Sequence, residues 1–142
     1  MLRLAIAASA CLSLILSSHP DQAPAVIEHD STVAKSEPGP HNGGGQTTAY
    51  SFFAQAPQRG LVFRKRALHT GAAIGYHRQD DDEIYYVVSG TGVLTLNGVE
   101  SVVGPGTAIL TRPGSSHALR QQGSGDLVII IAYQQPSPGR AP

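Results

Sequence analysis

The chain has 142 residues, a length that suits one small domain and leaves no room for two. Ten Lys and Arg balance ten Asp and Glu, so the formal net charge is zero. A neutral chain has no diffuse field that would attract nucleic acid or an anionic membrane. We therefore expect the partners to be small molecules or other proteins.

Residues 1–25 predict a cleaved export signal. Arg3 gives a short basic start, and residues 4–18 form an apolar or small run that falls short of the roughly 20 residues needed to span a bilayer. Residues 23–25, Ala-Pro-Ala, offer a small-x-small cleavage pattern. We predict a periplasmic or extracellular protein with no membrane span in its mature form, and a lipoprotein anchored at Cys11 or a retained membrane anchor is the weaker alternative.

Cys11 is the only cysteine, and cleavage after residue 25 removes it. The mature chain then has neither a disulfide nor a thiolate ligand. A bound metal must be held by histidine nitrogens or side-chain oxygens.

Residues 26–49 mix charges with PGP and GGG and follow neither apolar period. Such a composition predicts a flexible spacer, since too little apolar surface is buried to offset the entropy of ordering. Residues 136–142 are predicted to be a disordered tail for the same reason. His29 and His41 lie in the spacer, and we interpret both as solvated residues and not ligands.

Residues 50–135 change to short β-type runs separated by glycines. Asn97-Gly98 is a strong hairpin signal, and no helical period is present. This pattern predicts an all-β sandwich or barrel. The predicted strand runs are 61–68, 73–79, 83–90, 92–100, 107–112, 117–121 and 126–133.

Four polar side chains are expected to converge inside such a barrel. His77 and Gln79 are two residues apart, so they share a face of one strand, and Glu83 opens the next run. Residues 113–114, Pro-Gly, reverse the chain just before His117. Two imidazoles and one carboxylate suit Fe²⁺ and leave coordination positions open, and the same set accepts Mn²⁺, Ni²⁺, Co²⁺ or Zn²⁺.

Two motifs resemble those of the cupin family. The first cupin motif is G, five residues, HxH, three or four residues, E, six residues, G. It corresponds here to Gly71, AAIGY, His77-Arg78-Gln79, three aspartates, Glu83, IYYVVS and Gly90. The second is G, five residues, PxG, two residues, H, three residues, N, and it corresponds to Gly106, TAILT, Arg112-Pro113-Gly114, SS, His117 and Gln121.

The resemblance implies a small cupin-type, jelly-roll-like β-barrel over residues 50–135 that is often a homodimer. By carry-over it implies His77, Glu83 and His117 as ligands of one divalent metal. Gln79 stands where the family has its second histidine ligand. It either binds the metal weakly, orients a neighbouring ligand by a hydrogen bond, or marks a barrel that has lost its metal.

Several neighbouring residues have a functional and a structural interpretation. Tyr85 shares the face of Glu83 and is a candidate pocket wall or proton donor, whereas Tyr86 faces the other side and is interpreted as core packing. Asp80–Asp82 are interpreted as a solvated turn, and His69 as a surface residue.

The sequence favours an exported cupin whose metal acts as a Lewis acid or binds dioxygen, as in an oxygenase, isomerase or lyase acting on a small polar molecule. A non-catalytic barrel that binds a small molecule such as a saccharide, with or without metal, is the alternative. A metal-free structural barrel is the third possibility. Fold alone does not choose among these functions.

Overall fold

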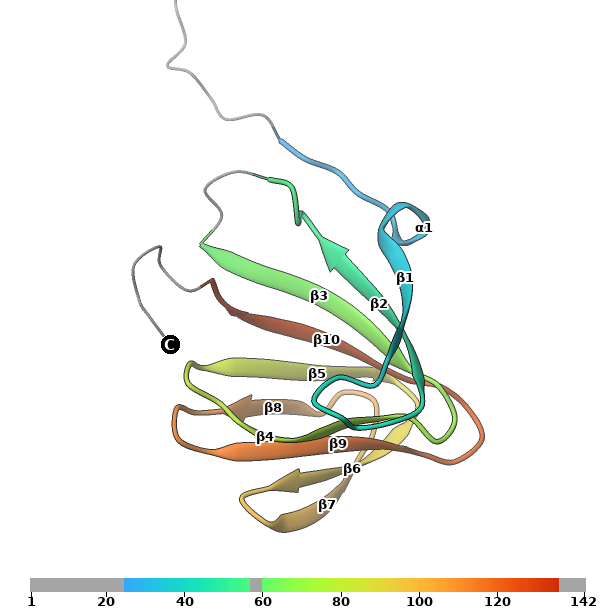
Figure 1. The fold of residues 1–142 in the computed structure, drawn as a ribbon, viewed down its shortest axis with the longest axis vertical. Helices are drawn as coiled ribbons and strands as arrows, with labels where there is room; N and C mark the ends of the chain where they lie inside the picture. Colours follow the sequence, from blue (N-terminus) through green and yellow to red (C-terminus); the bar gives the residue numbers. More distant parts are fainter. Residues whose placement is uncertain (1–24, 57–59, 136–142) are drawn as a thin grey trace, which may run out of the picture.

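The computed structural model describes residues 25–56 and 60–135. One short helix precedes ten strands (Figure 1). In chain order the elements are α1 (Asp30–Val33), β1 (Ala34–Pro38), β2 (Gln46–Phe52), β3 (Leu61–Leu68), β4 (Ala73–Arg78), β5 (Glu83–Ser89), β6 (Thr91–Leu96), β7 (Val99–Val103), β8 (Ala108–Thr111), β9 (Ser116–Gln122) and β10 (Leu127–Gln134).

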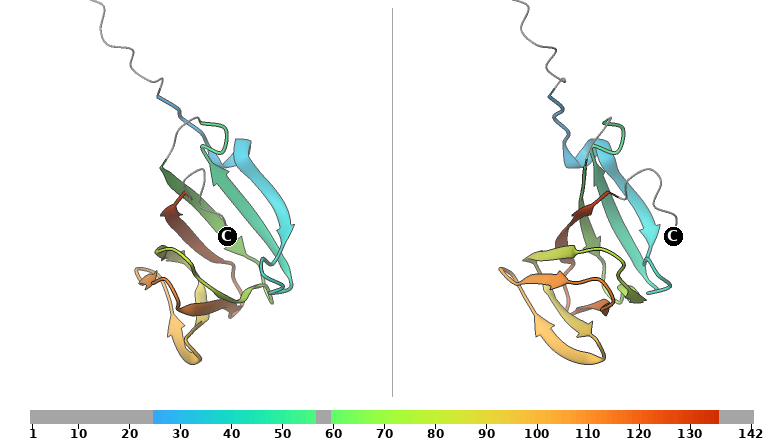
Figure 2. Two further views of the ribbon diagram at one scale, coloured as in Figure 1. Left: turned by 60° about the vertical axis from the view of Figure 1, so that its left-hand side comes forward. Right: turned by 90° about the vertical axis from the view of Figure 1, so that its left-hand side faces the viewer.

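The strands form two antiparallel sheets, which Figure 2 shows from two further sides. The larger sheet has the order β1-β2-β3-β10-β5-β8, and the smaller has the order β4-β9-β6-β7. Consecutive strands β4 and β5 lie in different sheets, as do β8 and β9. Two of the connections between the sheets, β4 to β5 and β8 to β9, thus lie within the sequence motifs.

The two sheets share one hydrophobic core. The larger sheet contributes Leu68, Val87 and Ile129, and the smaller contributes Ile74 and Leu119; all five are at most 1% exposed. These residues alternate with exposed ones along their strands, as expected for sheets with one face in the core. The predicted all-β fold is therefore confirmed.

The two faces of the larger sheet differ in what they cover. The register pairs Ile84 with Ala132 on β10 and Leu110 on β8, and these side chains lie on the outer face. The next residue along β5, Tyr85, pairs with Ile131 and Ile109 on the inner face. This alternation follows from the period of two in a strand.

The predicted strands from residue 61 onward are found. Asn97 and Gly98 have φ of 50° and 82°, which suits a hairpin turn of the left-handed kind, and they join β6 to β7. The run 92–100 therefore contains parts of two strands. No helix in the described parts of the chain, 25–56 and 60–135, is long and apolar enough to cross a membrane.

The prediction that residues 26–49 form a flexible spacer is wrong for most of that segment. It contains α1, β1 and the first half of β2, and β1 and β2 extend the larger sheet beyond β3. β1 buries no residue, so it shows no apolar period, and β2 buries only the small side chains Thr47 and Ala49. Pairing to β3 orders this segment. The predicted signal and the predicted tail lie outside the described residues, apart from residue 25.

Candidate metal centre

His77, Glu83 and His117 come together in the structure. Each offers one ligand atom, and these atoms all lie within 4.8 Å of one another. His77 on β4 is the register partner of His117 on β9, whereas Glu83 begins β5 in the other sheet. The cluster thus joins the two sheets at one end of the core.

The imidazole of His77 is oriented by a backbone carbonyl. Its Nδ1 lies 2.8 Å from the carbonyl oxygen of Gly75. A carbonyl oxygen only accepts, so Nδ1 carries the proton and Nε2 presents its lone pair to the cluster. An outer hydrogen bond of this kind fixes the tautomer that a metal requires.

His117 is held by a hydroxyl group. Its Nδ1 lies 2.5 Å from Oγ1 of Thr111 on β8, and both side chains are almost completely buried. Its Nε2 lies 3.2 Å from Oε2 of Glu83. Thr111 is the register partner of Glu83, so one rung of the β5 and β8 pair supplies both a candidate ligand and the group that orients another.

The two imidazole planes are compatible with a shared ion. The rings of His77 and His117 are 4.6 Å apart between centroids and inclined at 83°. An imidazole binds a metal in the plane of its ring, and two nearly perpendicular planes intersect in a line on which one ion can lie.

Gln79 faces the same cluster. Its amide Nε2 donates to Oε2 of Glu83 at 2.7 Å and lies 3.0 Å from Nε2 of His77. The prediction that His77 and Gln79 share a face is therefore confirmed. In this arrangement Gln79 is a hydrogen-bond donor to two candidate ligands, and turning its amide over would present the oxygen in the same place.

The side chain of Tyr85 is buried and lies beside the cluster. Its hydroxyl lies 3.2 Å from Nε2 of His117. Burial raises the pKa of Tyr85 well above 10.0, and the carboxylate of Glu83 adds to the shift. The phenol therefore keeps its proton. Tyr86 does face the opposite side, but it is 46% exposed, so its predicted packing in the core is wrong: that face of β5 is the outer face of the sheet.

His41 also reaches the cluster, a contact that its interpretation as a solvated residue and not a ligand does not include. It is exposed, yet its ring stacks on that of His77, with centroids 3.5 Å apart and an interplanar angle of 6°. Burial of the ring lowers the pKa of His41 below 6.5, and His77 adds to the shift. Sequence spacing gave no signal for this contact, because the loop that carries His41 belongs to the segment predicted to be a spacer.

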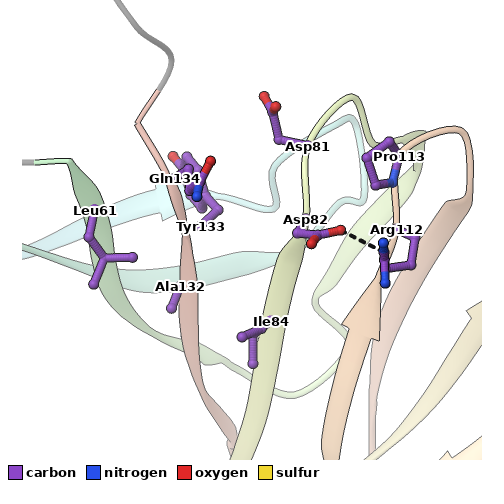
Figure 3. A pocket seen from close by; sticks show the side chains of 9 residues that line it. All are labelled: Leu61, Asp81, Asp82, Ile84, Arg112, Pro113, Ala132, Tyr133 and Gln134. Atoms are coloured by element: carbon purple, nitrogen blue, oxygen red, sulfur yellow. Dashed lines mark ion pairs between the residues drawn. The ribbon is translucent and has the colours of Figure 1, made fainter.

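Two hollows lie near this end of the barrel. The smaller, of about 260 Å³, contains the candidate ligands His77 and Glu83 and is also lined by His41, Arg78, Gln79, Asp80, Asp81 and Tyr133. The larger, of about 410 Å³, lies on the outer face and contains none of the three candidate ligands (Figure 3). It is bordered by an exposed ion pair between Asp82 and Arg112 at 2.8 Å. We assign function to the smaller hollow because only there do potential ligand atoms converge.

The other two histidines in the described residues, His29 and His69, make contacts away from the cluster. The ring of His69 lies between Thr48 and Asp126, at 2.9 Å and 3.0 Å, and so connects the ends of β2, β3 and β10. His29 caps α1 by accepting a hydrogen bond from the backbone N–H of Ser31. Neither contacts the cluster.

The fold and the cluster define a class: antiparallel β-barrels with imidazole and carboxylate groups gathered at one end of the core. A family model described as the cupin domain matches residues 66–133. The matched residues 66–133 are therefore assigned to the cupin domain, in agreement with the two motifs and the fold. His41 lies outside the matched range.

The chain is also similar to several known proteins in sequence or in fold. The oxalate-binding protein of Thermotoga maritima is 33% identical over 70 residues, which cover 49% of this chain and 58% of that relative. The solved structure of a predicted oxalate decarboxylase from Thermotoga maritima has a TM-score of 0.71 at 23% identity. The match covers 78% of this chain and 100% of that chain. A cupin 2 conserved barrel domain protein from Rhodopseudomonas palustris has a TM-score of 0.64 at 14% identity, with 72% of this chain and 71% of that chain covered. At these identities the solved structures show the fold alone.

Proposed function

We propose that this protein binds one divalent metal ion through His77, Glu83 and His117 and holds a small carboxylate compound at the open positions of that ion. The observation that carries the proposal is the convergence of the three ligand atoms within 4.8 Å. Gly75 and Thr111 support it, because they hold each Nδ1 and leave each Nε2 for the metal.

The donor set fits a transition metal. Two neutral imidazoles and one carboxylate leave a divalent ion with a net positive charge and with coordination positions free, and they accept Fe²⁺, Mn²⁺, Co²⁺, Ni²⁺ or Zn²⁺. When bound, such an ion supplies a Lewis acid that polarises an oxygen of the substrate. Tyr85, which keeps its proton, offers a hydrogen-bond donor beside His117.

The class of ligand is suggested by the relative that is named as an oxalate-binding protein. The hollow of about 260 Å³ is large enough only for a small molecule. A carboxylate provides the oxygen donors that a partly coordinated divalent ion requires.

Metal analysis of protein purified without a histidine tag tests the metal centre. The wild type is expected to contain one equivalent of a transition metal, and His117→Ala and His77→Ala are expected to lose it. His69→Ala is the matched control, because His69 lies away from the cluster. Wild-type protein without stoichiometric metal, or His117→Ala with the metal retained, would refute the proposal.

Catalysis and simple binding are distinguished by product analysis. The catalytic form of the proposal is a metal-dependent oxygenase, isomerase or lyase, and the alternative is a binding protein that releases its ligand unchanged. The donation of the Gln79 amide to two candidate ligands favours the alternative, since it adds order to the cluster without adding an acid or base. Incubation of the metal-loaded protein with oxalate, followed by measurement of formate, carbon dioxide and oxygen uptake, separates the two.

We further propose that the mature protein is exported and forms a homodimer. The support for export is the apolar run of residues 4–18. The support for the dimer is the outer face of the larger sheet, where large apolar side chains lie exposed on β3, β5 and β8. These are Phe63, Ile84, Tyr86, Val88 and Leu110. A second copy of the same face would cover them.

A further inference from the structure

The loop between β1 and β2 adds an imidazole to the pocket of the metal centre. His41 stacks on His77, and both rings line the hollow that also contains Glu83. This loop lies against β4 (Figure 1), although it precedes the matched cupin range by more than 20 residues. The pocket is thus completed by a segment outside the family match.

The backbone fixes the loop on β4. The N–H of Gly75 donates to the carbonyl of Pro40 at 2.9 Å, and that of Ala73 donates to Gly44 at 3.1 Å. The approach is so close that a Cβ on Gly75 would lie 1.9 Å from the carbonyl oxygen of His41. His41 itself has a φ of 53°, a backbone conformation that costs energy for most side chains. The position of the ring therefore follows from a defined loop.

His41 is not placed to be a fourth ligand. A metal bound by an imidazole lies in the plane of that ring. The rings of His41 and His77 are nearly parallel, at 6°, with centroids 3.5 Å apart, so one ion cannot lie in both planes. His77 has the lone pair that faces the cluster, and His41 lies beside it on the exposed side.

The nitrogens of His41 are available for another partner. Among residues 25–56 and 60–135, neither nitrogen of this ring has a hydrogen-bond partner, although the ring is held in place by stacking and by the loop. An ordered imidazole at the open side of a metal pocket is a suitable hydrogen-bond donor for an anion held there. We propose that His41 contacts the metal-bound carboxylate ligand and donates an N–H to one of its oxygens, an inference that rests on the proposed function.

Binding titrations of the purified protein test this role. Mn²⁺ is titrated first, and oxalate is then titrated into the Mn²⁺-loaded protein. His41→Asn removes the ring with a residue that tolerates positive φ. His41→Phe keeps an aromatic ring for the stack but has no N–H. His29→Asn is the matched control, because His29 is exposed and contacts the metal centre nowhere.

Both His41 variants are expected to weaken oxalate binding by about 10- to 100-fold, as for one hydrogen bond to a charged group, while the Mn²⁺ affinity stays unchanged. Unchanged oxalate affinity in either variant would overturn the inference. So would a fall in Mn²⁺ affinity in both His41 variants, since His41 would then act on the metal centre itself and not on the bound carboxylate. Wild-type protein that binds Mn²⁺ but not oxalate overturns this inference and leaves the metal centre standing. Wild-type protein that binds no metal overturns the proposed function instead.

Discussion

Replacement of Thr111 by Val tests how the metal centre is oriented. The change keeps the shape of a side chain that is 1% exposed and removes only the hydroxyl that lies 2.5 Å from Nδ1 of His117. His117 is itself fully buried, so no water replaces the lost partner. The imidazole is then left with an unsatisfied polar group at Nδ1 and without the contact that orients its ring.

Two magnitudes follow. A buried polar group that loses its partner costs about 1–3 kcal/mol, so the metal-free Thr111→Val protein is expected to lose that much free energy of unfolding. Loss of the group that orients a metal-binding histidine typically costs 10–100-fold in metal affinity, that is about 1.4–2.8 kcal/mol. Both effects come from one oxygen atom.

Urea denaturation in the presence of a chelator measures the first effect, and competition with a coloured chelator measures the second. Thr95→Val is the matched control, because Thr95 is a half-buried strand residue whose hydroxyl has no partner in the described residues. If Thr111→Val lowers stability but leaves metal affinity at the wild-type value, the hydroxyl does not orient a ligand. If neither quantity changes, the account of this contact is wrong.

Three further outcomes are expected. Gln79→His should bind the metal more tightly in the same competition assay, because an imidazole is a better donor than an amide for these metals; unchanged affinity would show that position 79 does not face the ion. Above pH 10, the free energy of unfolding should fall by up to about 1.4 kcal/mol per pH unit through Tyr85, because its raised pKa lets the folded protein keep a proton that the unfolded chain loses. Denaturation curves of Tyr85→Phe should lack this component, and an unaltered pH dependence would contradict the assignment. Tyr86→Asp should convert a dimer into a monomer in light scattering, whereas Val99→Asp on β7, which is also exposed but lies in the other sheet, should not.

The sequence predicts the barrel well because most of its strands are short β-type runs that end at glycine or proline turns. The spacing from His77 to Glu83 predicts the strand face on which each of these side chains lies and the turn between them. The Pro-Gly turn before His117 predicts where the strand of His117 begins. Local rules place each side chain on its strand, and the resemblance to the cupin motifs supplies the prediction that the three meet. Gln79 follows from the same alternation.

The parts that sequence reasoning misses depend on contacts between distant segments. β1 is an edge strand with no buried residue, so it carries no periodic signal and is ordered by pairing with β2. Thr111 lies inside the second motif, but nothing in its spacing shows that its hydroxyl meets His117. His41 reaches the pocket only because glycines at 43 and 75 let two backbones approach closely.

Gly75 links two parts of the molecule that are far apart in the sequence. Its N–H holds the loop of His41, and its carbonyl oxygen accepts the Nδ1 proton of His77. Occupation of the metal centre should therefore slow amide hydrogen exchange in that loop, and fraying of the N-terminal hairpin should weaken metal binding without the loss of a ligand. The N-terminal strands, which carry none of the three candidate ligands, should therefore influence how tightly the centre binds its metal.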